Sequence, residues 1–166
     1  MGTYVGRSWR RSDLGSVAIY IISPTRTVLV IDESFTDAHW KLPCGGVEDW
    51  DGGSAVAAIT DAAEQTKARI IAAAIREARE ETGGIELVPA EITLVEEQAR
   101  VSGFYYPHFC VACVSEEKLD THRDIGDEDG KKLTVADFYR GEMQQKILER
   151  HRTFVKRVER EISAAP

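Results

Sequence analysis

A long alanine-rich stretch over residues 54–82 constrains the fold of this chain most, because it is helical in pattern and β-rich sequence lies on both sides of it. Gly83, followed by a second glycine, predicts where the helix ends, since glycine accepts the left-handed backbone at a helix C-terminus. Polar residues near 64–67 allow the stretch to divide into two pieces. One long helix between β-rich halves indicates a sheet covered by helices.

Apolar, β-branched runs predict the strands. Residues 16–23 and 28–32 flank a PTRT turn and predict a hairpin, and WKLP (40–43) predicts a short extended piece closed by a flexible CGG. Residues 91–101 predict a strand or a pair of short strands, and 107–114 and 132–138 predict further strands, with a polar, acidic loop at 121–132. A final helix with one apolar face is predicted over roughly 140–163. This order predicts one α/β or α+β domain over residues 1–166, with a mixed sheet between helices.

The formal net charge of −7 argues against binding of nucleic acid through its phosphates, but it does not exclude a small anionic ligand that arrives with a metal ion. A sparse, odd cysteine count and the lack of an apolar run of signal-peptide or membrane-span length predict a cytoplasmic protein. Cys110 and Cys113 have CxxC spacing within an apparent strand, where they point to opposite faces, so we expect core packing rather than zinc.

The segment REAREETGG (76–84) gathers Glu77, Glu80 and Glu81 within one sector of about 100° on the helix. Such glutamates repel one another by roughly 0.2–0.5 kcal/mol per i,i+4 pair, and the helix dipole disfavours them near the C-terminus. Arg76 can pair with Glu80. One interpretation is a solvated charged face. The other is a site for Mg²⁺ or Mn²⁺, which prefer carboxylate oxygens.

With LPCGGVE upstream, REAREETGG resembles the signature of the Nudix (MutT-like) hydrolases: a glycine, five residues, a glutamate, seven residues, then R-E-hydrophobic-x-E-E-x-G-hydrophobic. The resemblance runs from about Ser16 to the last helix. It implies an α/β/α sandwich and metal-dependent cleavage of a diphosphate linkage in a nucleoside diphosphate derivative (a nucleotide sugar, dinucleoside polyphosphate, CoA-type molecule or NTP).

The resemblance also implies roles for individual residues. Glu77, Glu80 and Glu81 match the glutamates that hold Mg²⁺ or Mn²⁺ and can supply the base. Arg76 matches the arginine that orients them, and Gly45 matches the glycine whose carbonyl approaches the metal. Gly46 and Gly83 complete the motif as structural positions.

The first half of the motif departs from the family pattern. Asp51 stands where the family has glutamate, and 24 residues rather than seven separate it from Arg76. Residues 52–68 are therefore an insertion of 17. Glu48 and Glu64 are alternative acids for this position.

The insertion has its own predicted structure. Ser54 is a suitable N-cap for an alanine-rich helix over 55–65, either separate from the next helix or an extension of it. A pocket wall, a homodimer contact and a surface elaboration all remain open. Some Nudix enzymes that act on CoA-type substrates carry a similar insertion, but their arginine-rich pattern upstream of the glycines is absent here.

Further candidates lie outside the motif. Glu128, in the acidic turn GDEDG, is the first candidate for an additional metal ligand, with Asp127 and Asp129 as alternatives, although an ordinary acidic turn also fits this segment. One of the pair Glu96 and Glu97 is a weaker candidate. Tyr105 and Tyr106 are candidates to stack on a nucleobase, although a core role also fits aromatic residues. The alternative to an enzyme is a catalytically weak Nudix-fold module that senses a nucleotide.

Overall fold

The structure is a computed structural model, which describes the chain in segments. These are residues 14–25, 27–33, 40–96, 107–123, 125–126, 132–139 and 149–164. The strands are β1 Ser16–Ile22, β2 Thr27–Glu33, β3 Trp40–Lys41, β4 Cys44–Gly46, β5 Ile92–Glu96, β6 Pro107–Cys113, β7 Ile125–Gly126 and β8 Lys132–Tyr139. The helices are α2 Gly53–Ala57, α3 Ala62–Thr82, the 3₁₀ turn η1 Pro89–Glu91, α4 Glu116–Leu119 and α6 Glu149–Ala164.

The strands form one mixed sheet, as predicted. Hydrogen-bonded neighbours follow the order β5–β6–β1–β2–β8–β7, while β3 pairs with β2 and β4 pairs with β1. β1 and β6 run parallel, and the predicted hairpin of β1 and β2 is antiparallel. β1 therefore lies inside the sheet, which agrees with its nearly continuous apolar sequence.

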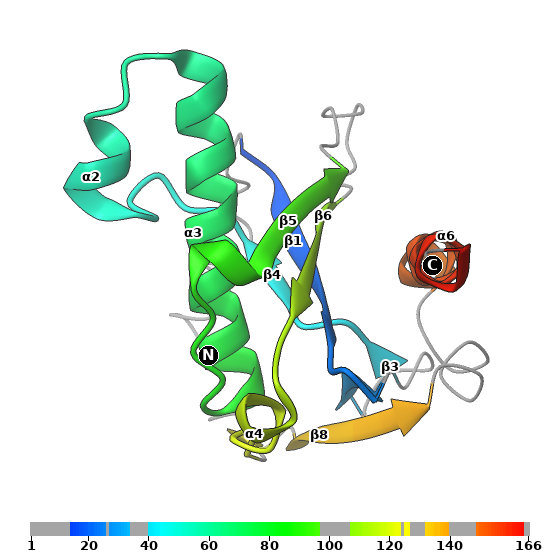
Figure 1. Cartoon of the computed structure of the whole chain (residues 1–166). Helices are drawn as coiled ribbons and strands as arrows, with labels where there is room; N and C mark the ends of the chain where they lie inside the picture. The colour runs from blue at the N-terminus through cyan, green and yellow to red at the C-terminus, as the bar shows by residue number, and fades with distance from the viewer. Residues whose placement is uncertain are drawn as a thin grey trace.

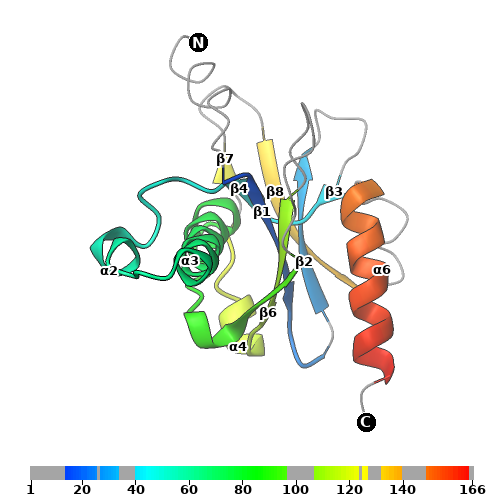
Figure 2. The same cartoon turned by 90° about the horizontal axis from the view of Figure 1, so that it is seen from above.

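Helices cover both faces of the sheet (Figures 1 and 2). On one side, the core contains Val17, Ile19 and Ile21 of β1 together with alanines and Ile70 of α3. On the other side, the intervening residues of β1 pack against Phe154, Val155 and Val158 of α6. Alternate residues of one strand thus serve two cores, and the predicted α/β/α sandwich is confirmed.

Local signals account for both ends of α3. The Asp61 carboxylate accepts a hydrogen bond of 2.9 Å from the Glu64 backbone N–H and caps the N-terminus. Gly83 ends the helix with a φ of 69°, in the left-handed region predicted for it. Beyond it, the Arg123 N–H donates to the Thr82 carbonyl at 2.8 Å. The helix that carries the glutamates is therefore held at both ends.

Several local predictions need correction. The CGG segment is strand β4 rather than a flexible closure, because it pairs with β1. The insertion does not form one helix over 55–65, since the chain leaves helical structure between α2 and α3. Ser54 lies inside α2, whose N-cap is Gly52. Neither α4 nor β7 was predicted. The described part of the last helix begins at Glu149, and residues 140–148 lie outside the described segments.

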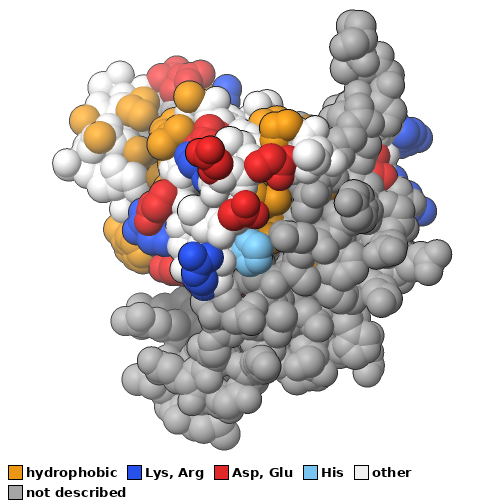
Figure 3. All heavy atoms as spheres, turned by 60° about the horizontal axis from the view of Figure 1, so that its bottom comes forward, with side chains coloured by type: hydrophobic (Ala, Val, Ile, Leu, Met, Phe, Trp, Pro, Cys, Tyr) orange, Lys and Arg blue, Asp and Glu red, His pale blue; other side chains and the backbone are white. Residues whose placement is uncertain are grey.

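At the end of the molecule that carries α4, positively and negatively charged side chains are mixed over the described surface (Figure 3). Local ion pairs include Arg79 with Glu86 at 2.7 Å and Lys118 with Glu91 at 2.5 Å. Cys110 is buried in β6 and Cys113 is exposed, as expected for two faces of one strand. Among the helices that the structure describes, none has both the length and the apolar character to cross a membrane.

Candidate active site

β4 and α3 bring the glycine segment against the glutamate turn. Gly45 pairs with Val17 of β1, which places β4 beneath α3. A Cβ atom on Gly45 would lie 2.1 Å from Cδ of Glu77 and equally close to a carboxylate oxygen. Only glycine therefore allows the backbone to approach the Glu77 carboxylate this closely.

Arg76 is the centre of the polar network. Its Nε and Nη2 donate to the two carboxylate oxygens of Asp51, at 2.7 and 3.0 Å. Nη1 donates to Glu77 at 2.7 Å and to Glu80 at 3.3 Å. Nη2 also donates to the Gly46 carbonyl at 2.7 Å. One guanidinium thus joins the glycine loop, the aspartate and two glutamates, as its planar fork of donors permits.

The structure places Asp51, and neither alternative acid, beside Arg76. Asp51 is only 2% exposed, and its Oδ2 also accepts the Glu48 backbone N–H at 2.8 Å. Glu48 contributes this N–H to the loop. Glu64 lies in the first turn of α3, about 18 Å along the helix from Arg76.

The inserted residues form α2 and the first part of α3, between Asp51 and Arg76. In α2, Val56 is buried against Gly52, which has a φ of 83°. The Gln65 side chain donates to the carbonyls of Val56 and Ala57, which ties α2 to the start of α3. In Figure 1, α2 stands at the edge of the molecule beside α3, away from the sheet. The insertion thereby extends α3 while Asp51 remains beside Arg76.

Sequence reasoning missed Arg69, which binds the backbone of the loop that carries Asp51. Its Nη1 donates to the carbonyl of Asp49 and, at 3.1 Å, to the carbonyl of Asp51. Arg69 lies about two helical turns before Arg76, so both arginines project from one face of α3. That spacing is the signal that would have identified it.

Trp50 was also missed. It is 64% exposed, and the Arg76 guanidinium lies 5.0 Å from the centre of its ring. The indole therefore covers Arg76 in a cation–π contact on the solvent side. An exposed tryptophan in a loop beside a charged motif is the signal that sequence reasoning passed over.

The glutamates occupy different environments. Burial raises the pKa of the Glu77 carboxyl to about 7, although the charge and hydrogen bond of Arg76 act to lower it. Glu80 has a 58% exposed side chain. The Glu81 carboxylate lies 4.0 Å from the ammonium of Lys41, and both side chains are largely buried. For Arg76, burial alone would lower the pKa, but Asp51 and Glu77 raise it above its ordinary value.

The donor chemistry of this turn fits a hard divalent cation. Carboxylates and backbone carbonyls are the ligands that Mg²⁺ and Mn²⁺ prefer, and the backbone of Gly45 lies against the Glu77 carboxylate. Within the described segments, however, no group of three acidic, histidine or cysteine side chains converges. The glutamates would therefore have to reorient around an ion.

Other sequence candidates are not placed at the site. Tyr105, Tyr106, Glu128 and Glu97 lie outside the described residues. Glu96 ends β5 beside a register shift, and its side chain is also outside the description.

Three comparisons set this chain beside known proteins. Residues 14–158 match the family model described as NUDIX domain. The comparison with curated proteins gave no match. A similar solved structure is the crystal structure of a mutT/nudix family protein from Listeria innocua, which is 21% identical. The likeness covers 92% of this chain and 96% of that chain with a TM-score of 0.56, and at this identity it concerns the fold.

Proposed function

This chain belongs to the Nudix family, and on that premise we propose that it hydrolyses a diphosphate linkage in a small nucleoside diphosphate derivative with the help of Mg²⁺ or Mn²⁺. Nudix hydrolases in general act on pyrophosphate-containing substrates and use divalent metal ions. The finer proposal concerns the residues of this chain that perform these tasks.

The observation that carries the proposal is the Arg76 network. Residues 52–68 interrupt the motif, yet Arg76 still contacts Asp51 and Glu77 at 2.7 Å. The same guanidinium also donates to the Gly46 carbonyl at 2.7 Å, so it holds the glutamate turn against the glycine segment. Catalysis by positioned charges requires such a preorganised arrangement, because the charges must not have to move during the reaction.

We propose Glu77, Glu80 and Glu81 as the metal-holding carboxylates, with the Gly45 carbonyl beside them. A bound divalent ion would neutralise phosphate charge and lower the pKa of a water molecule. Glu77 is buried and partly protonated near neutral pH, so it must lose its proton to act as a ligand. Lys41, beside Glu81, supplies a cation that can orient a phosphate group.

The proposal is tested by release of phosphate products from nucleotide sugars, dinucleoside polyphosphates, CoA and NTPs in the presence of Mg²⁺. We expect turnover of at least one class. Glu81→Gln should lower it by roughly 10²–10³-fold, on the scale of one key electrostatic group. Glu64→Gln is the matched control, because Glu64 is exposed at the far end of the same helix.

Two results would overturn the enzymatic proposal. One is no turnover of any substrate by the wild-type protein. The other is equal turnover by wild type and Glu81→Gln. Nucleotide binding measured by calorimetry without turnover would identify a sensor module instead.

A further inference from the structure

His151 of α6 is fully buried and contacts the segment just before the glycine loop. Its Nδ1 accepts a hydrogen bond of 3.1 Å from the backbone N–H of Leu42, which is buried and 109 positions away. The backbone N–H of Leu42 can only donate, so Nδ1 is the acceptor in this contact. This contact joins the helix on one face of the sheet to the chain that leads into β4.

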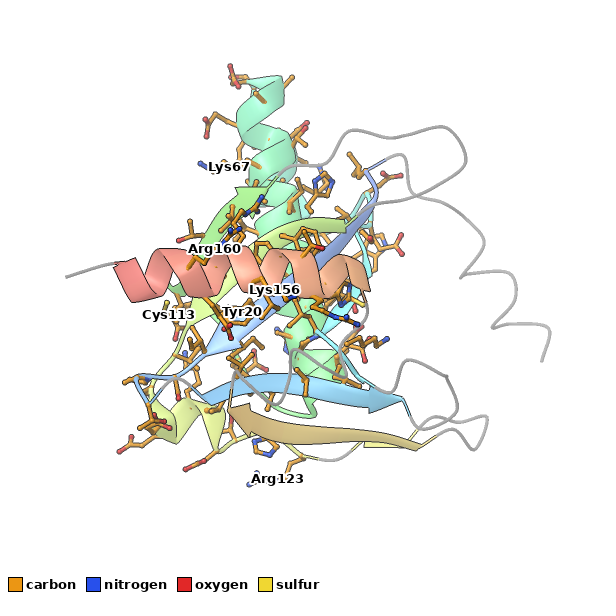
Figure 4. The ribbon with its side chains drawn as sticks, turned by 90° about the vertical axis from the view of Figure 1, so that its right-hand side faces the viewer. Tyr20, Lys67, Cys113, Arg123, Lys156 and Arg160 are labelled. Carbon is orange, nitrogen blue, oxygen red and sulfur yellow. The ribbon has the colours of Figure 1, made fainter. Side chains whose placement is uncertain are left out.

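Aromatic packing fixes the His151 ring. Phe109 of β6 meets the ring edge-to-face, with centroids 6.0 Å apart, and also stacks on Phe154 at 4.3 Å. Tyr20 of β1 meets Phe154 edge-to-face at 6.4 Å. In Figure 4, α6 crosses in front of the sheet with the labelled Tyr20 beside it. The acceptor nitrogen is therefore presented from a rigid aromatic cluster.

The segment that receives this hydrogen bond leads directly to the proposed metal site. The Pro43 carbonyl accepts from the Ile19 N–H of β1 at 2.9 Å, so neighbouring residues are held by β1 and by α6. Gly45 lies two residues after Pro43, and its backbone is so close to the Glu77 carboxylate that no side chain would fit between them. A small shift of residues 42–44 would therefore change how Gly45 meets Glu77.

We propose that His151 is a positioning residue for the metal site, which acts by holding Leu42 so that Gly45 faces Glu77. The proposal rests on the proposed function for its metal-binding consequence. Groups that hydrogen-bond directly to metal ligands commonly change metal affinity by about 10–100-fold when they are removed. His151 acts through the backbone, one step further from the ion, so we expect an effect of about 10-fold, at the lower end of that range.

The test compares three variants of the full chain under conditions in which each is folded by circular dichroism. His151→Asn retains an acceptor oxygen two bonds from Cβ, where Nδ1 stands. His151→Leu has a similar shape but no acceptor, so the Leu42 N–H loses its partner. Phe154→Leu is the control, because it loosens the same aromatic cluster and leaves the His151 hydrogen bond in place.

Two readouts separate positioning from general stability. The first is hydrogen exchange of the backbone amides of residues 42–47 in the metal-free protein. The second is the Kd for Mn²⁺ from calorimetry. His151→Leu should speed exchange in this segment and weaken Mn²⁺ binding by about 10-fold. His151→Asn should remain within a few-fold of wild type in both, and Phe154→Leu should lower Tm with Mn²⁺ affinity nearly unchanged.

The inference is overturned if His151→Leu leaves exchange at residues 42–47 unchanged, if it binds Mn²⁺ like wild type, or if Phe154→Leu weakens Mn²⁺ binding equally. Failure of the proposed function looks different. In that case the wild-type protein would bind no Mn²⁺, while the exchange data would still decide whether His151 holds this segment.

Discussion

The Asp51 carboxylate accepts two hydrogen bonds from the Arg76 guanidinium, of 2.7 and 3.0 Å, although the two residues are 25 positions apart and helix α2 lies between them in the sequence. Asp51 is nearly inaccessible to solvent, so the carboxylate of this pair is buried. Removal of Asp51 would leave Arg76 with Glu77 and Glu80 as its remaining carboxylate partners, and two of its hydrogen bonds would be lost.

Asp51→Ala should lower the free energy of unfolding by about 1–3 kcal/mol, because Arg76 loses two hydrogen bonds and the Glu48 N–H loses its acceptor, while Glu77 and Glu80 still face the guanidinium. Urea unfolding followed by circular dichroism measures this change. Asp49→Asn is the control, since the Asp49 side chain is exposed in the same loop. A loss below about 1 kcal/mol in Asp51→Ala would show that the pair does not stabilise the loop.

Gly45→Ala should abolish most activity and metal binding, whereas Gly46→Ala should be tolerated. A Cβ on Gly45 would lie 2.1 Å from the Glu77 carboxylate carbon, but the nearest atom to a Cβ on Gly46 is 3.8 Å away. Displacement by about 1 Å can cost about 10²-fold in rate. Initial rates and Mn²⁺ titration of the two variants provide the measurement, and equal behaviour would contradict the close approach.

The metal-free protein should become less stable as the pH rises from about 4.5 to about 7. Burial raises the pKa of Glu77 from 4.5 in the unfolded reference to about 7 in the fold, so folding favours its protonated form. Its contribution is complete below pH 4.5 and is lost as the pH passes about 7. The expected size is on the order of 1–3 kcal/mol.

Thermal unfolding in EDTA between pH 4.5 and 8 tests this dependence. Glu77→Gln cannot ionise, so its stability should change less with pH than that of wild type. Parallel curves for the two proteins would mean that Glu77 does not titrate in this range.

Arg69→Met should destabilise the loop that carries Asp51, with a loss of about 0.5–3 kcal/mol for hydrogen bonds from a charged donor. Arg69 donates to the carbonyls of Asp49 and Asp51. Lys67→Met is the matched control, because Lys67 is exposed on the same helix (Figure 4). Comparison of Tm and of trypsin cleavage in residues 47–60 measures the effect, and identical cleavage in both variants would exclude a role for Arg69 in the loop.

Local sequence patterns were sufficient to predict the helices and strands that depend on neighbouring residues. Helical periodicity placed Arg76 and the three glutamates on one turn, and Gly83 ended α3 as predicted. β-Branched runs predicted β1, β2, β6 and β8, and the family resemblance is confirmed by the NUDIX domain match. The roles of the individual site residues remain predictions. The sequence did not predict where the insertion divides into α2 and α3, because its alanines favour a helix throughout. The Asp61 cap decided where α3 begins.

The sequence by itself thus determined the fold class, the family and the chemical character of the glutamate turn, since helical periodicity, β-branched runs and motif spacing are local properties of the chain. Only the tertiary structure decided which acid pairs with Arg76, that Arg69 fastens the loop, and that His151 holds Leu42. These contacts join residues far apart in sequence, and their partners are selected by how the strands and helices pack. No local spacing specifies such a choice, because the geometry that brings Asp51 to Arg76 exists only after α3 lies across β4.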